Sequence, residues 1–324
     1  MRNFLVLAAA LLAVSAVSAL ADDKCQLKRY AVIPFETDEN AQIYVPATLG
    51  GRSTRLMLDT GSFWSLITED LANALNLKPK TSNYVQMRDA AGTKLDKIVS
   101  VPDVSIGALS YGAADFFVGG ADAGRTIEQL GGLYGQNLLT QVDLEIDNAA
   151  KTISLFSQDH CRGDGVYWTD EAVTLQYKRA AALQPLGTLI RQQVNKDQID
   201  PPIVGADMEG EQVSVLFDTG AANTAMDLEL ARRRFGIEPS SPGVKPAGKV
   251  YVASGDAVET YSYTFKSLTI AGIRFENVPV LLGKFRESLQ IVLGMHELKH
   301  LHLYFSFKEG MIYVTGADAG RPQH

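Results

Sequence analysis

The sequence has few cysteines, no basic cluster and only one long apolar run. Its 324 residues carry a formal net charge of −7 and no extended basic cluster, so nothing indicates nucleic-acid binding. After the N-terminal segment, no stretch is apolar enough to span a bilayer. The 5 histidines limit the number of zinc ligands that the chain can offer.

The apolar run lies at the N-terminus. A positively charged start precedes an Ala-rich stretch up to about residue 21, which ends in small residues before Asp22. This pattern predicts a cleaved secretory signal over residues 1–21. An uncleaved anchor is the alternative, although the run is short for a membrane span. We therefore expect an exported protein, periplasmic or secreted, with no membrane attachment after cleavage.

The only two cysteines are Cys25 and Cys161. In an exported chain, two cysteines most simply form one disulfide. It would close a loop of 161 − 25 = 136 residues, for which the chain-entropy model gives roughly 4–5 kcal/mol of stabilisation. Two unpaired thiols are the alternative.

One short stretch occurs twice. Residues 56–62 read Leu-Met-Leu-Asp-Thr-Gly-Ser, and residues 215–221 read Val-Leu-Phe-Asp-Thr-Gly-Ala. In each copy an apolar run with strand character ends in a carboxylate, a hydroxyl and a glycine. A carboxyl group at the end of a buried strand ionises less easily than one in water. Two copies predict a pair of carboxylates built by internal symmetry.

The distances between the repeated features agree. Asp218 follows Asp59 by 218 − 59 = 159 positions, and Gly294 follows Gly135 by 294 − 135 = 159 positions. Both glycines end an apolar-apolar-Gly element, 135 − 59 = 76 and 294 − 218 = 76 positions after the motif carboxylate. Equal offsets across divergent sequence indicate an internal duplication.

The segments between these features predict mostly strands. Period-two patterns around Gly50-Gly51 and Glu209-Gly210 predict hairpins that lead into the motifs. Short helices are predicted after Thr68 and from about Asp227 to Gly236. Two further hairpins have flexible tips, one at Ala91 and Gly92 and one at Ser254 and Gly255.

These repeated motifs resemble the pepsin/retropepsin family of aspartic peptidases, and residues 133–141, Leu-Tyr-Gly-Gln-Asn-Leu-Leu-Thr-Gln, are similar to the retroviral form. The resemblance covers both halves of the chain. It implies two homologous acid-protease β-barrel-like domains related by a pseudo-twofold axis. Residues 22–161 would form the N-terminal domain, and residues 162–324 the C-terminal domain, including a linker to about residue 200.

The resemblance also implies roles for individual residues. Asp59 and Asp218 would be the catalytic dyad. The hydroxyl of Ser62 would hydrogen-bond Asp59, whereas Ala221 has no hydroxyl to bond Asp218. Because one carboxylate lacks this donor, the apparent pKa values of the dyad would be raised. The remaining positions would support the site or cover the substrate. Thr60 and Thr219 would link the two halves, and Gly61 and Gly220 would let the backbone approach the dyad. Gly135 and Gly294 would lie behind the active loops. The flaps over the substrate would be the two hairpin tips, at Ala91 and Gly92 and at Ser254 and Gly255.

The chemistry that this implies is peptide hydrolysis by activated water. Two adjacent carboxyl groups share one proton, so one can act as a base and the other as an acid. No metal, cofactor or covalent intermediate is required. The expected substrate is a peptide or unfolded protein, and the expected active form is a monomer.

Two other functions are consistent with parts of the sequence. His296-Glu297-Leu298-Lys299-His300 matches a zinc metallopeptidase pattern in which two histidines share a helix face and Glu297 acts as a base. The duplication allows only a short helix there, and no other helix offers an obvious third ligand. A non-catalytic peptide-binding protein could use the same fold, but binding alone does not require both acids.

Overall fold

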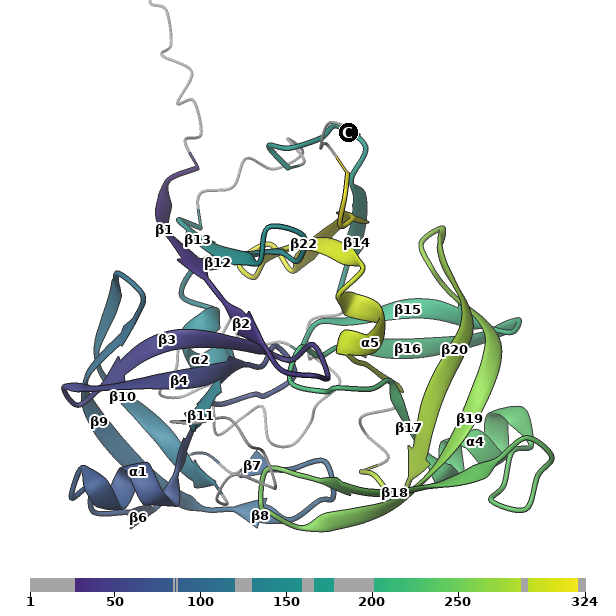
Figure 1. Ribbon diagram of the computed structural model, residues 1–324, viewed down its shortest axis with the longest axis horizontal. Coiled ribbons are helices and arrows are strands. Elements are labelled where there is room, and N and C mark those ends of the chain that lie inside the picture. Colours follow the sequence, from purple (N-terminus) through teal and green to yellow (C-terminus); the bar gives the residue numbers. More distant parts are fainter. Residues whose placement is uncertain are drawn as a thin grey trace, which may run out of the picture.

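The computed structural model describes residues 27–83, 85, 87–119, 130–158, 166–177, 201–286 and 291–319. Within them the chain is mostly β, and Figure 1 shows two barrels side by side with a third sheet above them. The predicted signal segment, Cys25 and Cys161 lie outside the described residues, so the export signal and the disulfide stay predictions.

The first barrel comes from the N-terminal half. Its sheet runs β2-β3-β4-β11-β5-β10-β9-β6, and a further pairing between β3 and β9 closes six of these strands into a ring. Every second residue of a strand faces the same side, and the apolar residues on that side fill the ring, as Leu56 and Leu58 do on β4. The strands are β2 Glu36–Thr37, β3 Ile43–Leu49, β4 Arg52–Leu58, β5 Leu66–Thr68, β6 Lys80–Thr81, β9 Lys97–Ile106, β10 Leu109–Gly119 and β11 Leu130–Tyr134.

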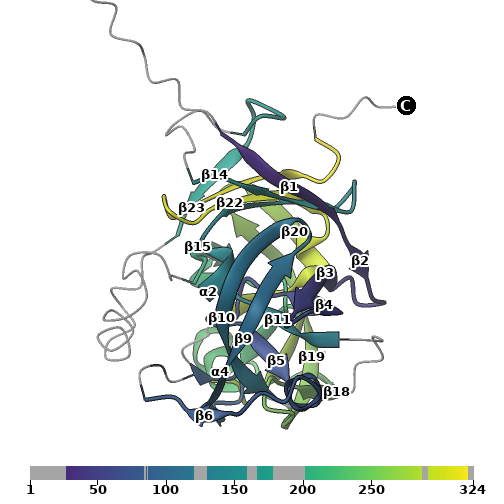
Figure 2. The same ribbon diagram turned by 90° about the vertical axis from the view of Figure 1, so that its left-hand side faces the viewer.

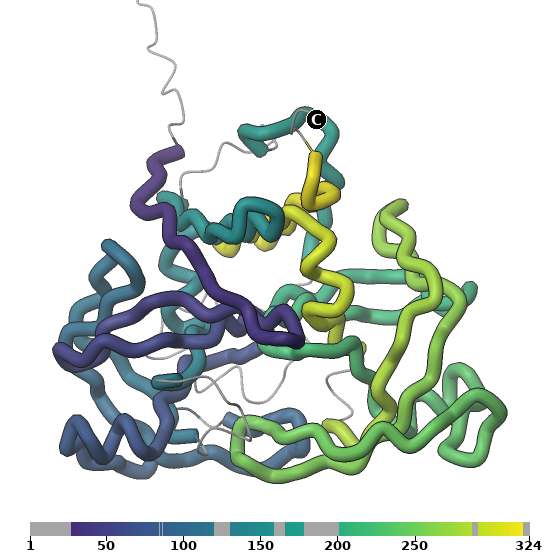
Figure 3. Tube along the Cα trace, in the orientation of Figure 1, coloured from purple at the N-terminus to yellow at the C-terminus, as the bar shows by residue number. Residues whose placement is uncertain are grey.

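The second barrel repeats this arrangement. Its sheet runs β15-β16-β21-β17-β20-β19-β18, and the pairing of β15 with β19 closes it. The ring order matches that of the first barrel strand for strand, which confirms the predicted pair of homologous barrel-like domains; the trace in Figure 3 follows both. The strands are β15 Ile203–Met208, β16 Glu211–Phe217, β17 Ala225–Asp227, β18 Lys245–Tyr251, β19 Ala257–Ile270, β20 Ile273–Gly283 and β21 Ile291–Leu293.

A third sheet joins the two halves. Its order is β1-β13-β12-β22-β23-β14, and the antiparallel pairing of β12 with β22 places Leu144 opposite Phe305. Strand β14 falls in the segment that the sequence assigned to a linker, yet it pairs with β23. The sheet is seen from a second side in Figure 2. Its strands are β1 Arg29–Pro34, β12 Asp143–Asp147, β13 Thr152–Phe156, β14 Val173–Gln176, β22 Leu301–Ser306 and β23 Met311–Gly316.

The helices are short and confirm the two that were predicted. Helix α1 (Glu69–Ala74) begins after Thr68, whose side chain accepts the N–H of Leu71. Helix α4 (Leu228–Phe235) begins after Asp227 and ends at Gly236 in the left-handed conformation. Single turns follow the two repeated glycines, α2 (Gln136–Leu139) and α5 (Met295–Leu298). Within the described ranges, no helix is both long and apolar enough to cross a membrane.

Candidate active site

The two motif carboxylates lie at the ends of equivalent strands. Strand β4 ends immediately before Asp59, and β16 ends immediately before Asp218. Each strand pairs in parallel with the strand that precedes the repeated glycine, β11 or β21. The Asp59 N–H donates to the Tyr134 carbonyl at 3.0 Å, and the Asp218 N–H donates to the Leu293 carbonyl at 3.1 Å. The two barrels therefore present their carboxylates in the same local geometry.

Thr60 and Thr219 connect the two motifs through four hydrogen bonds. The Thr60 N–H donates to Oγ1 of Thr219 at 3.1 Å, and the Thr219 N–H donates to Oγ1 of Thr60 at 3.1 Å. The hydroxyl of Thr60 donates to the Phe217 carbonyl and that of Thr219 to the Leu58 carbonyl, both at 2.8 Å. Both threonines are fully buried. The structure thus contains the link between the halves that the resemblance implied.

The motif glycines leave room for the opposite carboxylate. A Cβ atom on Gly61 would lie 2.3 Å from Cγ of Asp218, and one on Gly220 would lie 2.4 Å from Cγ of Asp59. Contacts this short do not occur between real atoms, so any larger residue would displace the carboxyl group. Each glycine therefore packs directly against the carboxylate of the other barrel.

The carboxyl groups of Asp59 and Asp218 are hydrogen-bonded to each other. Asp59 is 8% exposed, and Asp218 keeps only part of its surface accessible. Burial raises the pKa of Asp218 above its ordinary value, and the hydrogen bonds from the Gly220 N–H, from Asp59 and from the N–H groups of Ala221 and Gly61 oppose that rise. Desolvation is the larger effect, so the pair retains a proton where an exposed aspartic acid has lost it.

The hydroxyl of Ser62 does not take the part that the resemblance implied. It donates to the Trp64 carbonyl at 2.8 Å, whereas the Ser62 backbone N–H donates to Oδ1 of Asp59 at 2.7 Å. The corresponding N–H of Ala221 donates to Oδ1 of Asp218 at 3.2 Å. A backbone N–H is available whatever the side chain, so the change from Ser to Ala weakens the hydrogen bonding of the carboxylate less than the resemblance implied.

Gly135 and Gly294 lie tightly behind the motif loops. A Cβ on Gly135 would lie 2.7 Å from the Trp64 carbonyl carbon, and one on Gly294 would lie 2.5 Å from that of Asn223. Each glycine N–H donates to a hydroxyl that precedes it by 70 residues, Ser65 for Gly135 and Thr224 for Gly294. The role of these two hydroxyls was not predicted from the sequence, although the offset of 159 positions relates Ser65 to Thr224.

The predicted flap hairpins meet each other. The first consists of β7 (Met87–Arg88) and β8 (Lys94–Leu95), and its tip holds Ala91 and Gly92. The second is the turn with Ser254 and Gly255 between β18 and β19. Oδ2 of Asp89 accepts the Ser254 N–H at 3.1 Å, and the hydroxyl of Thr93 donates to Asp256 at 2.6 Å. Figure 1 places β4 and β16 between these hairpins and the third sheet.

An apolar cluster attaches the first flap to the first motif. Trp64, five residues after Asp59, packs with Met87 and Leu95 of the flap strands and with Phe117 of β10. The Trp64 indole N–H donates to the Asp115 carbonyl at 2.8 Å. Trp64 therefore serves as core packing at the base of the flap.

The segment from His296 to His300, which matches the metallopeptidase pattern, does not form one continuous helix. Helix α5 is a single turn that ends before His300. Glu297 is buried, where it accepts the hydroxyl of Thr224, and Nδ1 of His296 lies 2.7 Å from its other oxygen. Glu297 thus supports the second motif loop. Among the described residues, no three potential metal-ligating side chains come together.

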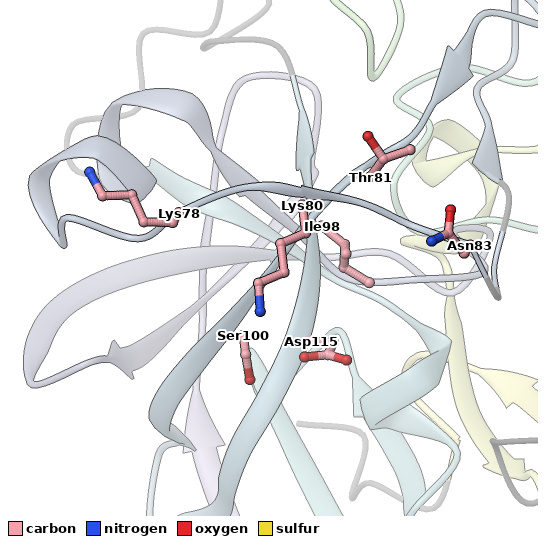
Figure 4. A pocket seen from close by; sticks show the side chains of 7 residues that line it. All are labelled: Lys78, Lys80, Thr81, Asn83, Ile98, Ser100 and Asp115. Atoms are coloured by element: carbon pink, nitrogen blue, oxygen red, sulfur yellow. The ribbon is translucent and has the colours of Figure 1, made fainter.

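A separate hollow lies on the first barrel. Figure 4 shows this pocket of about 470 Å³, which includes the cationic side chains of Lys78 and Lys80. None of its lining residues belongs to either motif or flap tip, so it is distinct from the paired carboxylates. The lining residues are Lys78, Lys80, Thr81, Asn83, Ile98, Ser100 and Asp115.

The comparison with protein families agrees with this geometry. The family described as "Aspartyl protease" matches the chain twice, over residues 45–137 and 204–296. The first match contains Asp59 and Gly135, and the second contains Asp218 and Gly294. A comparison with curated proteins found no match.

Proposed function

Because the chain belongs to the aspartyl protease family, we propose that it is an endopeptidase in which Asp59 and Asp218 act together on one peptide bond. The observation that supports this most directly is the hydrogen bond between the two carboxyl groups, which come from different halves of one chain. The threonine link and the opposed glycines support the same pairing.

In the proposed reaction the two carboxyl groups share one proton. The ionised carboxylate removes a proton from water, and the protonated carboxyl group hydrogen-bonds the substrate carbonyl as its oxygen becomes negative. The water oxygen bonds to the carbonyl carbon, and the proton taken from the water then passes to the nitrogen of the leaving amine as the carbon–nitrogen bond breaks. Aspartic proteases are the standard example of such a shared proton, and the raised pKa of Asp218 favours this state here.

The proposal also covers the oligomeric state, the substrate and the location of the enzyme. One chain supplies both carboxylates, so we propose a monomer that hydrolyses peptides or unfolded proteins. We also propose export to the periplasm or the medium, with residues 1–21 as the signal.

The test is cleavage of an unfolded protein by the purified chain. Asp59→Asn and Asp218→Asn should each remove activity, and Asp70→Asn, an exposed carboxylate on α1, should not. Pepstatin should block cleavage and a metal chelator should not. Inhibition by the chelator alone would support the metallopeptidase alternative, and tight peptide binding without cleavage would support a binding protein.

A further inference from the structure

Arg286 connects the second motif region with the first flap. It follows β20, whose last residues pair with β17, the strand directly after the second motif loop. The Arg286 N–H donates to the Ala90 carbonyl at 2.7 Å, and its Nη1 donates to the Arg88 carbonyl at 3.4 Å. The guanidinium therefore lies beside the flap of the first barrel, on the segment that follows β20 of the second barrel.

The guanidinium has a buried donor with no partner. Within the part of the chain that the structure describes, Nε of Arg286 is buried and makes no hydrogen bond. Buried polar atoms of native proteins are nearly always hydrogen-bonded, so an exception often marks a group that serves a ligand. Burial also lowers the pKa of Arg286, as expected of a cation that has lost hydration.

Asp89, whose charge acts on Arg286, already has other hydrogen-bond partners. Oδ1 of Asp89 accepts the N–H groups of Ala91 and Thr93, and its Oδ2 accepts that of Ser254. After burial, the charge of Asp89 has the next largest effect and raises the pKa of Arg286, while Arg88, also positive, lowers it. Among the described residues no carboxylate forms an ion pair with Arg286, so the Nε–H remains available to an anion.

We propose that Arg286 binds a carboxylate of the peptide substrate beneath the first flap and so determines a preference for an acidic group at that position. This rests on the proposed function. The Nε edge of a guanidinium presents parallel N–H groups that match the two oxygens of a carboxylate. A neutral amide offers a single acceptor oxygen and no negative charge, so it matches the guanidinium less well than a carboxylate does.

The carboxylate has two sources, an Asp or Glu side chain within the peptide and the free C-terminus. A series of peptides in which Glu or Gln occupies each position around one cleavage site detects a side-chain preference. The same peptides with a free or amidated C-terminus detect recognition of the chain end. The measured quantity is kcat/KM for each pair.

The variants are Arg286→Met, Arg286→Lys and the matched control Arg88→Met, which removes an exposed guanidinium of the same flap. The parent enzyme should favour one carboxylate-bearing peptide about 10- to 100-fold, the range expected of a charged hydrogen bond. Arg286→Met should lose that preference, so that kcat/KM becomes equal for the charged and the neutral peptide of each pair. Arg286→Lys should retain part of the preference, and Arg88→Met all of it.

Two results would overturn the inference: equal cleavage of every charged and neutral pair by the parent enzyme, or an equal loss with all peptides in Arg286→Met. The second would show that Arg286 only holds the flap. Binding of the same peptides to the Asp218→Asn variant, measured by fluorescence anisotropy, tests this inference independently of hydrolysis. Carboxylate-dependent binding that Arg286→Met abolishes would support the site even if no peptide were cleaved.

Discussion

Thr60 and Thr219 each accept the backbone N–H of the other at 3.1 Å, so the two halves of the chain are joined at the residues that directly follow the paired carboxylates. The link is symmetric, since each hydroxyl also donates to the carbonyl before the opposite Asp. Buried and away from water, these bonds hold the relative position of the carboxyl groups on which the proposed catalysis depends.

The first prediction concerns this threonine link. Thr60→Val should destabilise the protein by about 1–3 kcal/mol, because it leaves the Thr219 N–H and the Phe217 carbonyl without their hydroxyl partner. Chemical denaturation measures the loss. Thr60→Ser keeps the hydroxyl and should lose about 1 kcal/mol or less; an equal loss in both variants would mean that the hydroxyl contributes little.

The second prediction concerns the glycines that face the carboxylates. Gly61→Ala should abolish hydrolysis, because its Cβ would lie 2.3 Å from Cγ of Asp218 and push that group away from Asp59. The control is Gly205→Ala on β15, where the added Cβ meets nothing within 4 Å and activity should be unchanged. Full activity in Gly61→Ala would contradict the close packing of the dyad.

The third prediction is the pH dependence of hydrolysis. The active pair holds one proton, and burial raises the pKa of Asp218. A raised pKa means that the proton is lost only at higher pH, so kcat/KM should persist above the range in which exposed aspartic acid ionises, near 4. A profile that falls away at that pH would count against the shared proton.

The structure also changes the expected effect of Ala221. Because the Ser62 hydroxyl bonds the Trp64 carbonyl and backbone N–H groups bond both carboxylates, Ala221→Ser should leave the pH profile unchanged. A shift toward lower pH would show that a hydroxyl at this position does reach the carboxylate.

The fourth prediction concerns Asp143, a buried carboxyl group on the third sheet. Burial raises its pKa to about 7, although the hydroxyls of Ser306 and Tyr304 bond it. The folded state therefore binds a proton that the unfolded state releases near pH 4. As pH rises from about 4 to about 7, the free energy of unfolding should fall by up to roughly 4 kcal/mol from this group.

Asp143→Asn tests that contribution, because the amide keeps an acceptor but does not ionise. Unfolding measured from pH 4 to pH 8 should show a flatter pH dependence for the variant and greater stability than the parent above pH 7. Asp59 and Asp218 remain in both proteins, so their effect cancels in the difference. The same slope in parent and variant would refute the assignment to Asp143.

The sequence predicted the repeated parts of the molecule well. The offset of 159 positions located both carboxylates, the threonines beside them and the glycines behind them, because a duplicated fold repeats its local contacts at equal spacing. Thr68 and Asp227 marked helix starts because their side chains accept N–H groups of the first turn.

The features that the sequence did not reveal depend on contacts between the halves. The place of strand β14 in the third sheet was not predicted, because its pairing partner, β23, lies more than a hundred residues away. The contact of Asp89 with Ser254 and the place of Arg286 beside Ala90 also join distant segments, without a repeated counterpart to indicate them. The predicted bond from the Ser62 hydroxyl to Asp59 was wrong, because the Trp64 carbonyl competes with the carboxylate for its proton.

The most direct test of the account is hydrolysis by Asp59→Asn, by Asp218→Asn and by an equal mixture of the two. If each chain builds one site from its own two halves, both variants lose at least about 100-fold in kcat/KM, and the mixture is no more active than either alone. Activity in either variant, or recovery of activity on mixing, would show that the carboxylates of one chain do not form the working pair.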